Sequence, residues 1–214
     1  MSFRFIAALI GAAALALPLS QQASASGGNY TVSGGTPAEQ ATVRAALNAS
    51  SFNWGLLPQT IQVTIQPGAG DYATPGSVSI DPQLLDMGAF AWAVVQHEFA
   101  HQIDFLLLTD SDRAQLAQAI GGAQWFPSGA PLPHSSYSCE RFASLVSWAY
   151  WSSSQNSLRP NSTADEAGGM PPPAFRALLS QMLNIPVTPV ASPPTVKVFA
   201  PKLKRMALKR SSAA

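Results

Sequence analysis

Two histidines enclose a glutamate in His97-Glu98-Phe99-Ala100-His101, an H-E-x-x-H sequence. On a helix, residues four apart lie about 40° from each other on one face, so both imidazoles can bind the same zinc ion. Glu98 lies on the same side. Zinc lowers the pKa of a bound water to about 7, and a carboxylate beside that water can act as general base when it attacks a carbonyl. The alternative, a chance pairing of histidines in a packed helix, fits poorly with a chain that has only three.

A catalytic zinc site needs a third protein ligand and one open position, and the sequence offers two candidates. Glu140 stands alone beside the apolar segment FASLVSWAYW, where an unpaired carboxylate is costly to bury. Asp104 lies on the face of the two histidines but one turn further along, where orienting an imidazole suits it better than binding the metal. We expect Glu140 to be the third ligand and Asp104 to orient a ligand imidazole without binding the metal. Two alternatives stay open. Asp104 could be the third ligand, and Glu140 could be a carboxylate at the start of a helix that only interacts with the helix dipole.

The composition excludes several classes of protein. Hydrophobic residues make up 47% of the 214 residues and charged residues only 11%, which argues against a highly charged, mainly disordered chain. The formal net charge of +1 argues against a nucleic-acid-binding protein, which would be strongly basic. With one cysteine, the chain forms no intrachain disulfide and no zinc module of four cysteines.

Residues 1–25 have the pattern of a secretory signal peptide. Arg4 provides the positive charge, an apolar stretch follows it, and an A-S-A cleavage sequence ends at residue 25. The apolar stretch is shorter than the roughly 20 residues of a membrane-spanning helix. No other segment qualifies, so no transmembrane segment is expected after cleavage. We therefore predict a secreted protein, either extracellular or associated with the cell wall.

The C-terminal segment, residues 186–214, is predicted to be a Pro-rich linker followed by a basic tail. From residue 191 onward it has six basic residues and no acidic one, whereas residues 26–190 have five basic residues and all 11 acidic ones. A disordered, solvated tail is the simplest interpretation. The alternative is an electrostatic contact with an anionic surface, such as a cell-wall polymer or a lipid.

The body of the chain, residues 26–185, combines helical and extended patterns. Thr36-Pro37-Ala38-Glu39 is a capping box with proline at the first helical position, and TIQVTIQ alternates apolar and polar residues as a half-buried strand does. The same rules predict helices over 37–48, 89–108, 110–120, 138–151 and 173–183, and strands over 60–66 and 77–81. Because strands precede the long central helix and mainly helices follow it, the expected fold class is α+β.

The sequence HEFAHQIDF, followed about forty residues later by ERFA, resembles the zincin metallopeptidases of the gluzincin branch. It is especially similar to peptidases of the Mlc titration factor A and anthrax lethal factor type, over residues 77–151. The resemblance implies a zincin-like fold, with a small sheet whose edge strand packs on the active-site helix and a mainly helical C-terminal subdomain. It also implies one zinc ion per chain. The implied ligands are His97, His101 and Glu140, and the implied general base is Glu98.

The resemblance carries two further expectations. Lethal-factor-like peptidases stabilise the oxyanion with a tyrosine upstream of the ligand glutamate. That tyrosine would be Tyr137, although it stands only three residues before Glu140, and His134 is the competing donor. In zincins an edge strand before the active-site helix pairs with the extended substrate. Residues 77–81 would then be the peptide-binding strand, with an ordinary sheet strand as the alternative.

These observations predict a secreted zinc-dependent metallopeptidase that acts on peptide or protein substrates. One rival is an exported binding or surface protein that keeps zinc only for its structure. A structural zinc site is closed by four protein ligands, which a chain with three histidines and one cysteine can hardly supply. The other rival is a zinc hydrolase that acts on cell-wall amides.

Overall fold

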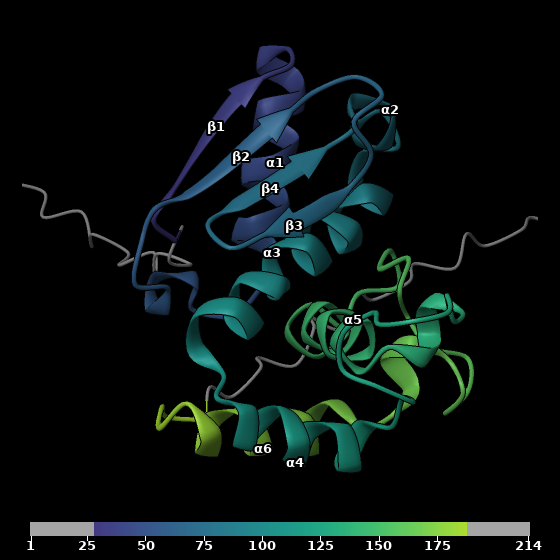
Figure 1. Cartoon of the computed structure of the whole chain (residues 1–214). Coiled ribbons are helices and arrows are strands. Elements are labelled where there is room, and N and C mark those ends of the chain that lie inside the picture. Colours follow the sequence, from purple (N-terminus) through teal and green to yellow (C-terminus); the bar gives the residue numbers. More distant parts are fainter. Residues whose placement is uncertain (1–27, 188–214) are drawn as a thin grey trace, which may run out of the picture.

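The structure, a computed structural model, describes residues 28–187. The expected signal peptide, residues 1–25, and nearly all of the expected tail, 186–214, lie outside the described residues. The part of the chain that is described has the expected α+β class, with a small sheet followed by a mainly helical half (Figure 1). Within it, no helix is long and apolar enough to span a membrane.

The sheet has four strands in the order β1-β2-β4-β3. β1 (Tyr30–Gly34), β2 (Ile61–Ile65) and β4 (Ser77–Ile80) run parallel, whereas β3 (Tyr72–Thr74) pairs antiparallel with β4. β2 alternates buried and more exposed residues as the sequence predicts. The three parallel strands therefore run from the edge strand β1 to β4, and the short antiparallel strand β3 forms the other edge.

The edge of the sheet differs from the expectation. β4 pairs with β2 on one side and with β3 on the other, so the prediction that residues 77–81 form the edge strand is wrong. The edge next to the central helix is β3. Gly76 adopts a φ of 82° in the turn between the two strands, a conformation that glycine adopts without steric cost, and this turn folds residues 72–74 back onto β4. Three largely exposed residues give too short a pattern to be recognised as a strand.

Two helices lie against each other on one face of the sheet (Figure 1). α1 (Pro37–Ala49) begins at the predicted capping box, in which the Thr36 hydroxyl accepts from the Glu39 amide at 3.3 Å and the Glu39 carboxylate accepts from the Thr36 amide at 2.6 Å. α3 (Trp92–Leu107) is the predicted central helix. Ahead of α3 lie the short helix α2 (Pro82–Leu85) and a 3₁₀ turn.

The residue at the middle of the H-E-x-x-H sequence fixes the rotation of α3. Phe99 is fully buried and contacts the rings of Trp54 and Tyr30, with centroid distances of 5.1 and 5.8 Å. Because Phe99 lies two residues from each histidine, about 200° around the helix, its packing under the sheet turns His97 and His101 toward the other half of the molecule.

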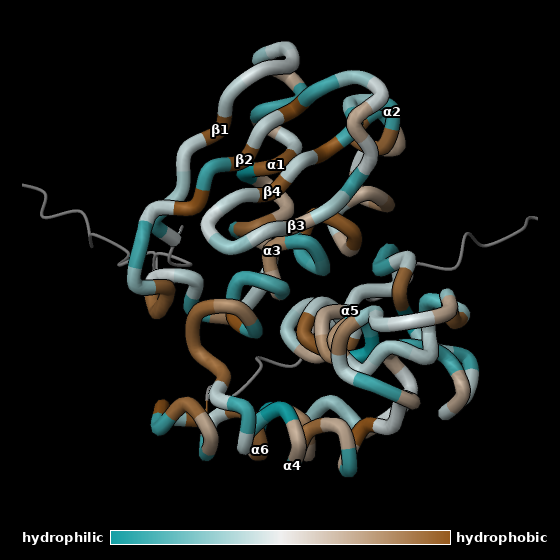
Figure 2. Tube along the Cα trace, in the orientation of Figure 1, coloured by the Kyte–Doolittle hydropathy of each residue, from teal (hydrophilic) through white to brown (hydrophobic). Residues whose placement is uncertain are grey.

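The C-terminal half is built from three helices. They are α4 (Asp110–Ile120), α5 (Ser138–Tyr150) and α6 (Pro172–Met182), all close to their predicted bounds. α5 contacts α3, α4 and α6 and is buried along most of its length. Apolar and polar residues are interspersed along α4 and α6 (Figure 2), as suits helices with one buried face. The long connections between these helices contain two 3₁₀ turns, His134–Ser136 and Glu166–Gly168.

Candidate metal centre

The two histidines of α3 meet a glutamate from the first turn of α5. Nε2 of His97 and Nε2 of His101 lie 3.1 and 3.2 Å from Oε2 of Glu140, and the two nitrogen atoms lie 3.3 Å apart. Ligand atoms bound to a tetrahedral zinc ion at about 2.0–2.1 Å are separated by about 3.3 Å. Two imidazole nitrogens and one carboxylate oxygen are also a common donor set for catalytic zinc. His97, His101 and Glu140 thus form a buried group that can hold a metal ion.

The charge of Glu140 is stabilised by its imidazole neighbours. Burial acts to raise the pKa of this carboxyl, but hydrogen bonds from the imidazoles of His101 and His134 outweigh burial, so the pKa lies well below its ordinary value. An ionised carboxylate in the first turn also interacts favourably with the dipole of α5. Glu140 is therefore charged at neutral pH, as a metal ligand must be.

The metal-binding group opens onto a cleft of about 300 Å³. Glu98, His101, His134 and Glu140 line its polar side, and residues 71–73 border it along the edge strand β3. Aromatic side chains complete the wall, where Phe105 and Phe126 stack with centroids 6.3 Å apart. The cleft thus brings the metal-binding group, a free strand edge and an apolar wall together.

Glu98 lies in the same cleft, and its carboxylate has no hydrogen-bond partner among the described residues, 28–187. The residue is 7% exposed. Burial raises the pKa of Glu98, and the nearby His97 and His101 only partly offset this effect. A carboxylate with a raised pKa and free oxygen atoms can accept a proton from a water held at the metal-binding group.

Of the two expected oxyanion donors, the structure brings only His134 to the site. Its Nε2 lies 3.2 Å from Oε2 of Glu140, and its ring stacks on that of His97 at 6.0 Å. Hydrogen bonds to Glu140 and Glu166 raise its pKa to about 10, so its Nε2 carries a proton and can donate. The Tyr137 hydroxyl instead accepts from the Leu132 amide at 2.9 Å, and Tyr137 does not line the cleft.

Substitutions of these two residues should therefore have different effects. If the protein is the peptidase that the sequence predicts, His134→Ala should lower kcat by about 100-fold, the usual cost of losing one oxyanion donor. Tyr137→Phe should leave kcat unchanged and lower the free energy of unfolding by about 1 kcal/mol, because it removes one hydrogen bond. Steady-state kinetics and denaturant unfolding of both variants check this. A larger loss of kcat in Tyr137→Phe would restore Tyr137 as the donor.

The Asp104 carboxylate has other hydrogen-bond partners than the sequence predicts. It is fully buried, and its oxygens accept from Nε of Arg113 at 2.7 Å and Nε1 of Trp125 at 2.9 Å. The expectation that it hydrogen-bonds an imidazole is not met, nor does it belong to the metal-binding group. It lies one turn beyond His101, where the side of α3 faces α4 and the loop with Trp125. Asp104 instead holds that loop, whose next residue, Phe126, lines the cleft.

Comparisons with protein-family models, with curated proteins and with solved structures found no match for this chain.

Two residues near the metal-binding group were missed in the sequence. Ser144 lies four residues after Glu140 on the same face of α5, and its Oγ lies 3.0 Å from Nδ1 of His97. The helical spacing could have identified Ser144. Glu166 lies in the 3₁₀ turn after a long connection and contacts both Ser144 and His134. No local pattern marks Glu166, because only the folded chain brings it to the site.

Proposed function

We propose that this protein is a zinc-dependent metallopeptidase. The observation that carries the proposal is the combination of three ligand atoms at tetrahedral spacing with an uncommitted Glu98 carboxylate in one cleft. His97, His101 and Glu140 would hold the ion. Export of the protein is part of the proposal and depends on the sequence of residues 1–25 alone.

The residues of the cleft divide the chemistry of peptide hydrolysis between them. When bound, the metal supplies a Lewis acid that activates a water molecule and polarises the scissile carbonyl. The Glu98 carboxylate takes a proton from the attacking water and passes it to the nitrogen of the leaving amine. Nε2–H of His134 donates a hydrogen bond to the oxygen that gains negative charge. The aromatic wall excludes water from one side of the scissile bond.

The edge strand β3 supports an extended peptide as the substrate. One side of β3 is paired with β4, and the cleft lies along the residues of the strand, so a peptide can add to the sheet through main-chain hydrogen bonds. Gln102 ties this hairpin to α3. Its side-chain nitrogen donates to the Thr74 and Ser77 carbonyls at 2.9 and 3.1 Å, and its oxygen accepts from the Gly76 amide at 2.7 Å. The residue after His101 therefore sets the distance between the peptide-binding edge and the metal.

A purely structural zinc fits the donor set less well. A structural site is closed by four protein ligands, whereas the described metal-binding group has three. Cys139, the nearest sulfur, points to Glu140 Oε1 at 3.5 Å, and burial raises its thiol pKa far above the ordinary value. Cys139 is also not a member of the metal-binding group, so it does not supply a fourth ligand there.

Removal and return of the metal test the proposal. We expect the purified protein to cleave members of a peptide library, to lose this activity when a chelator removes zinc, and to regain it with about one equivalent of zinc. Mass spectrometry of the products identifies the cleaved bonds. If the cleavage persists in protein shown to contain no metal, the proposal is wrong. If zinc-loaded protein cleaves muropeptides but no peptide of the library, the cell-wall amidase takes its place.

A further inference from the structure

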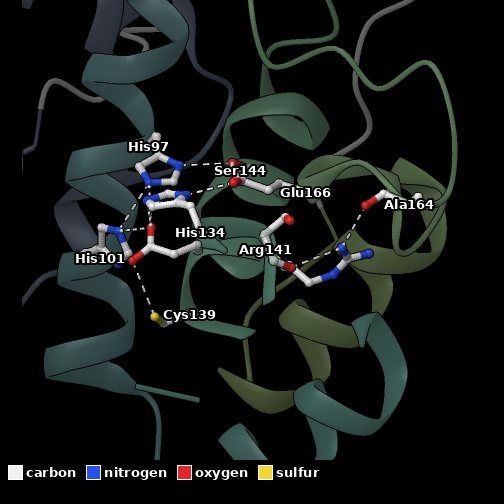
Figure 3. Close-up of polar contacts among 10 residues, drawn as sticks. His97, His101, His134, Cys139, Arg141, Ser144, Ala164 and Glu166 are labelled. Atoms are coloured by element: carbon white, nitrogen blue, oxygen red, sulfur yellow. Dashed lines mark hydrogen bonds and ion pairs between the residues drawn. The ribbon is translucent and has the colours of Figure 1, made fainter. Parts of the chain in front are cut away.

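A chain of hydrogen bonds connects Glu166 to His97 through Ser144. Oε2 of Glu166 accepts from the Ser144 hydroxyl at 2.9 Å, and Ser144 Oγ lies 3.0 Å from Nδ1 of His97. The other oxygen, Oε1, accepts from Nδ1 of His134 at 2.7 Å. Figure 3 shows Ser144 and Glu166 together beside the rings of His97 and His134. The Glu166 carboxylate thus binds His134 directly and His97 through the Ser144 hydroxyl.

The direction of these hydrogen bonds determines the tautomer of His97. A serine hydroxyl has one proton, and Ser144 gives it to the Glu166 carboxylate, which can only accept. Oγ of Ser144 must then accept the contact with His97, so the proton of a neutral His97 lies on Nδ1. Its Nε2 carries the lone pair, and Nε2 is the atom that faces Glu140 and the position of the metal.

The surroundings of Ser144 leave it little freedom. Ser144 is fully buried in the middle of α5, and its hydroxyl contacts Glu166 and His97. The Glu166 carboxylate is partly buried, with 21% of the side chain exposed. If Ser144 turned its proton toward His97, it would leave one oxygen of this carboxylate without its donor, which is unfavourable for a desolvated charge.

Arg141 fixes the segments that carry Glu166 and His134. Arg141 is 7% exposed, and its guanidinium donates to main-chain carbonyls. Nη1 binds the Ala164 carbonyl at 3.2 Å (Figure 3), and Nη2 binds the Thr163 carbonyl at 3.2 Å, both just ahead of Glu166. Nη1 also lies 3.5 Å from the carbonyl of Ser135, the residue next to His134. The residue after Glu140 therefore holds both segments in place.

We propose that Glu166 and Ser144 act as one positioning unit, which keeps the lone pair of His97 Nε2 on the metal and holds His134 beside it. This inference rests on the proposed metal site and names the residues that prepare it for zinc. Residues that orient a ligand imidazole change metal affinity by about 10–100-fold when they are removed. Glu166 also links metal binding to the orientation of the proposed oxyanion donor.

Zinc affinity of three variants tests the unit. In competition with a chelating dye, Ser144→Ala and Glu166→Ala should each bind zinc about 10–100-fold more weakly than the wild type. The double variant should bind no more weakly than the weaker single variant, because residues that act through each other are not additive. If the two losses multiply, Glu166 does not act through Ser144 and the unit is refuted.

Ser147→Ala is the matched control. Ser147 is also a buried serine of α5, and its Oγ donates to the Ala93 carbonyl at 3.0 Å, away from the metal-binding group. Its removal should cost similar stability and change zinc affinity less than about 3-fold. Equal zinc affinity in Ser144→Ala and Ser147→Ala would overturn the inference, because both effects would then be structural.

A spectroscopic measurement tests the tautomer independently of peptide hydrolysis. In zinc-loaded wild-type protein, NMR with ¹⁵N-labelled histidine should show a proton on Nδ1 of His97 that exchanges slowly with solvent. In Ser144→Ala this proton should exchange much faster, and in Ser147→Ala it should not. A wild-type His97 bound to zinc through Nδ1 contradicts the inference. Zinc-loaded protein that passes these tests without cleaving any peptide refutes the proposed peptidase and leaves the positioning unit intact.

Discussion

Replacing His101 with alanine is expected to remove both the zinc and the peptidase activity that we propose for this protein. Its Nε2 lies 3.2 Å from the Glu140 oxygen and 3.3 Å from Nε2 of His97, so the variant would leave an ion with only two protein ligands, where catalytic zinc has three. Metal analysis should find about one zinc per wild-type chain and almost none in His101→Ala. Cleavage of a peptide should fall to the background rate.

The third histidine of the chain provides the matched control for this variant. His134 contacts Glu140 but does not belong to the metal-binding group, so His134→Ala should keep about one zinc per chain. A His101→Ala protein with its full zinc content would show that the ion is held elsewhere. Zinc loss in His134→Ala as complete as in His101→Ala would indicate a closed site of four protein ligands, and hence a structural zinc.

Glu140→Ala and Asp104→Asn should separate a metal ligand from a structural carboxylate. Glu140 supplies the oxygen of the metal-binding group, so Glu140→Ala should reduce zinc affinity strongly, with most of the zinc lost during dialysis. Asp104→Asn should retain zinc. It should instead lower the free energy of unfolding by about 1.5–3 kcal/mol, because it weakens buried hydrogen bonds to Arg113 and Trp125.

Zinc titration and denaturant unfolding of both variants test this ranking. The sequence predicts that Asp104 orients an imidazole, whereas the hydrogen bonds of its carboxylate to Arg113 and Trp125 indicate a structural role. If Asp104→Asn loses zinc and Glu140→Ala keeps it, Asp104 is the third ligand and the likeness to gluzincins is lost.

The metal-binding group was predictable because its pattern is local. The spacing of His97 and His101 on one helix needs no tertiary contact, and Glu140 stood out as the single acidic residue of a largely apolar helix. Helix starts were predictable for the same reason. Thr36 and Glu39 form the expected capping box, and α4 begins within one residue of its prediction.

Features that depend on tertiary contacts could not be predicted from the sequence. β1 has only five residues, of which none is fully buried, and β3 has three residues that become a strand only by pairing with β4. Asp104 shares a helix face with His101, but the neighbours that bind its carboxylate, Arg113 and Trp125, come from later elements. Glu166 reaches the site only after the chain has folded around α5.

The central claim is tested most directly by measuring zinc content and peptide cleavage on the same preparations of wild-type protein and Glu98→Gln. Glutamine keeps the size of the side chain but cannot take the proton of the attacking water, which should slow cleavage by about 100- to 10,000-fold. Glu98 is not a member of the metal-binding group, so both proteins should contain about one zinc per chain. The account predicts cleavage by the wild type alone. Equal cleavage by both proteins, or a wild type that contains its zinc and cleaves no peptide, would contradict it.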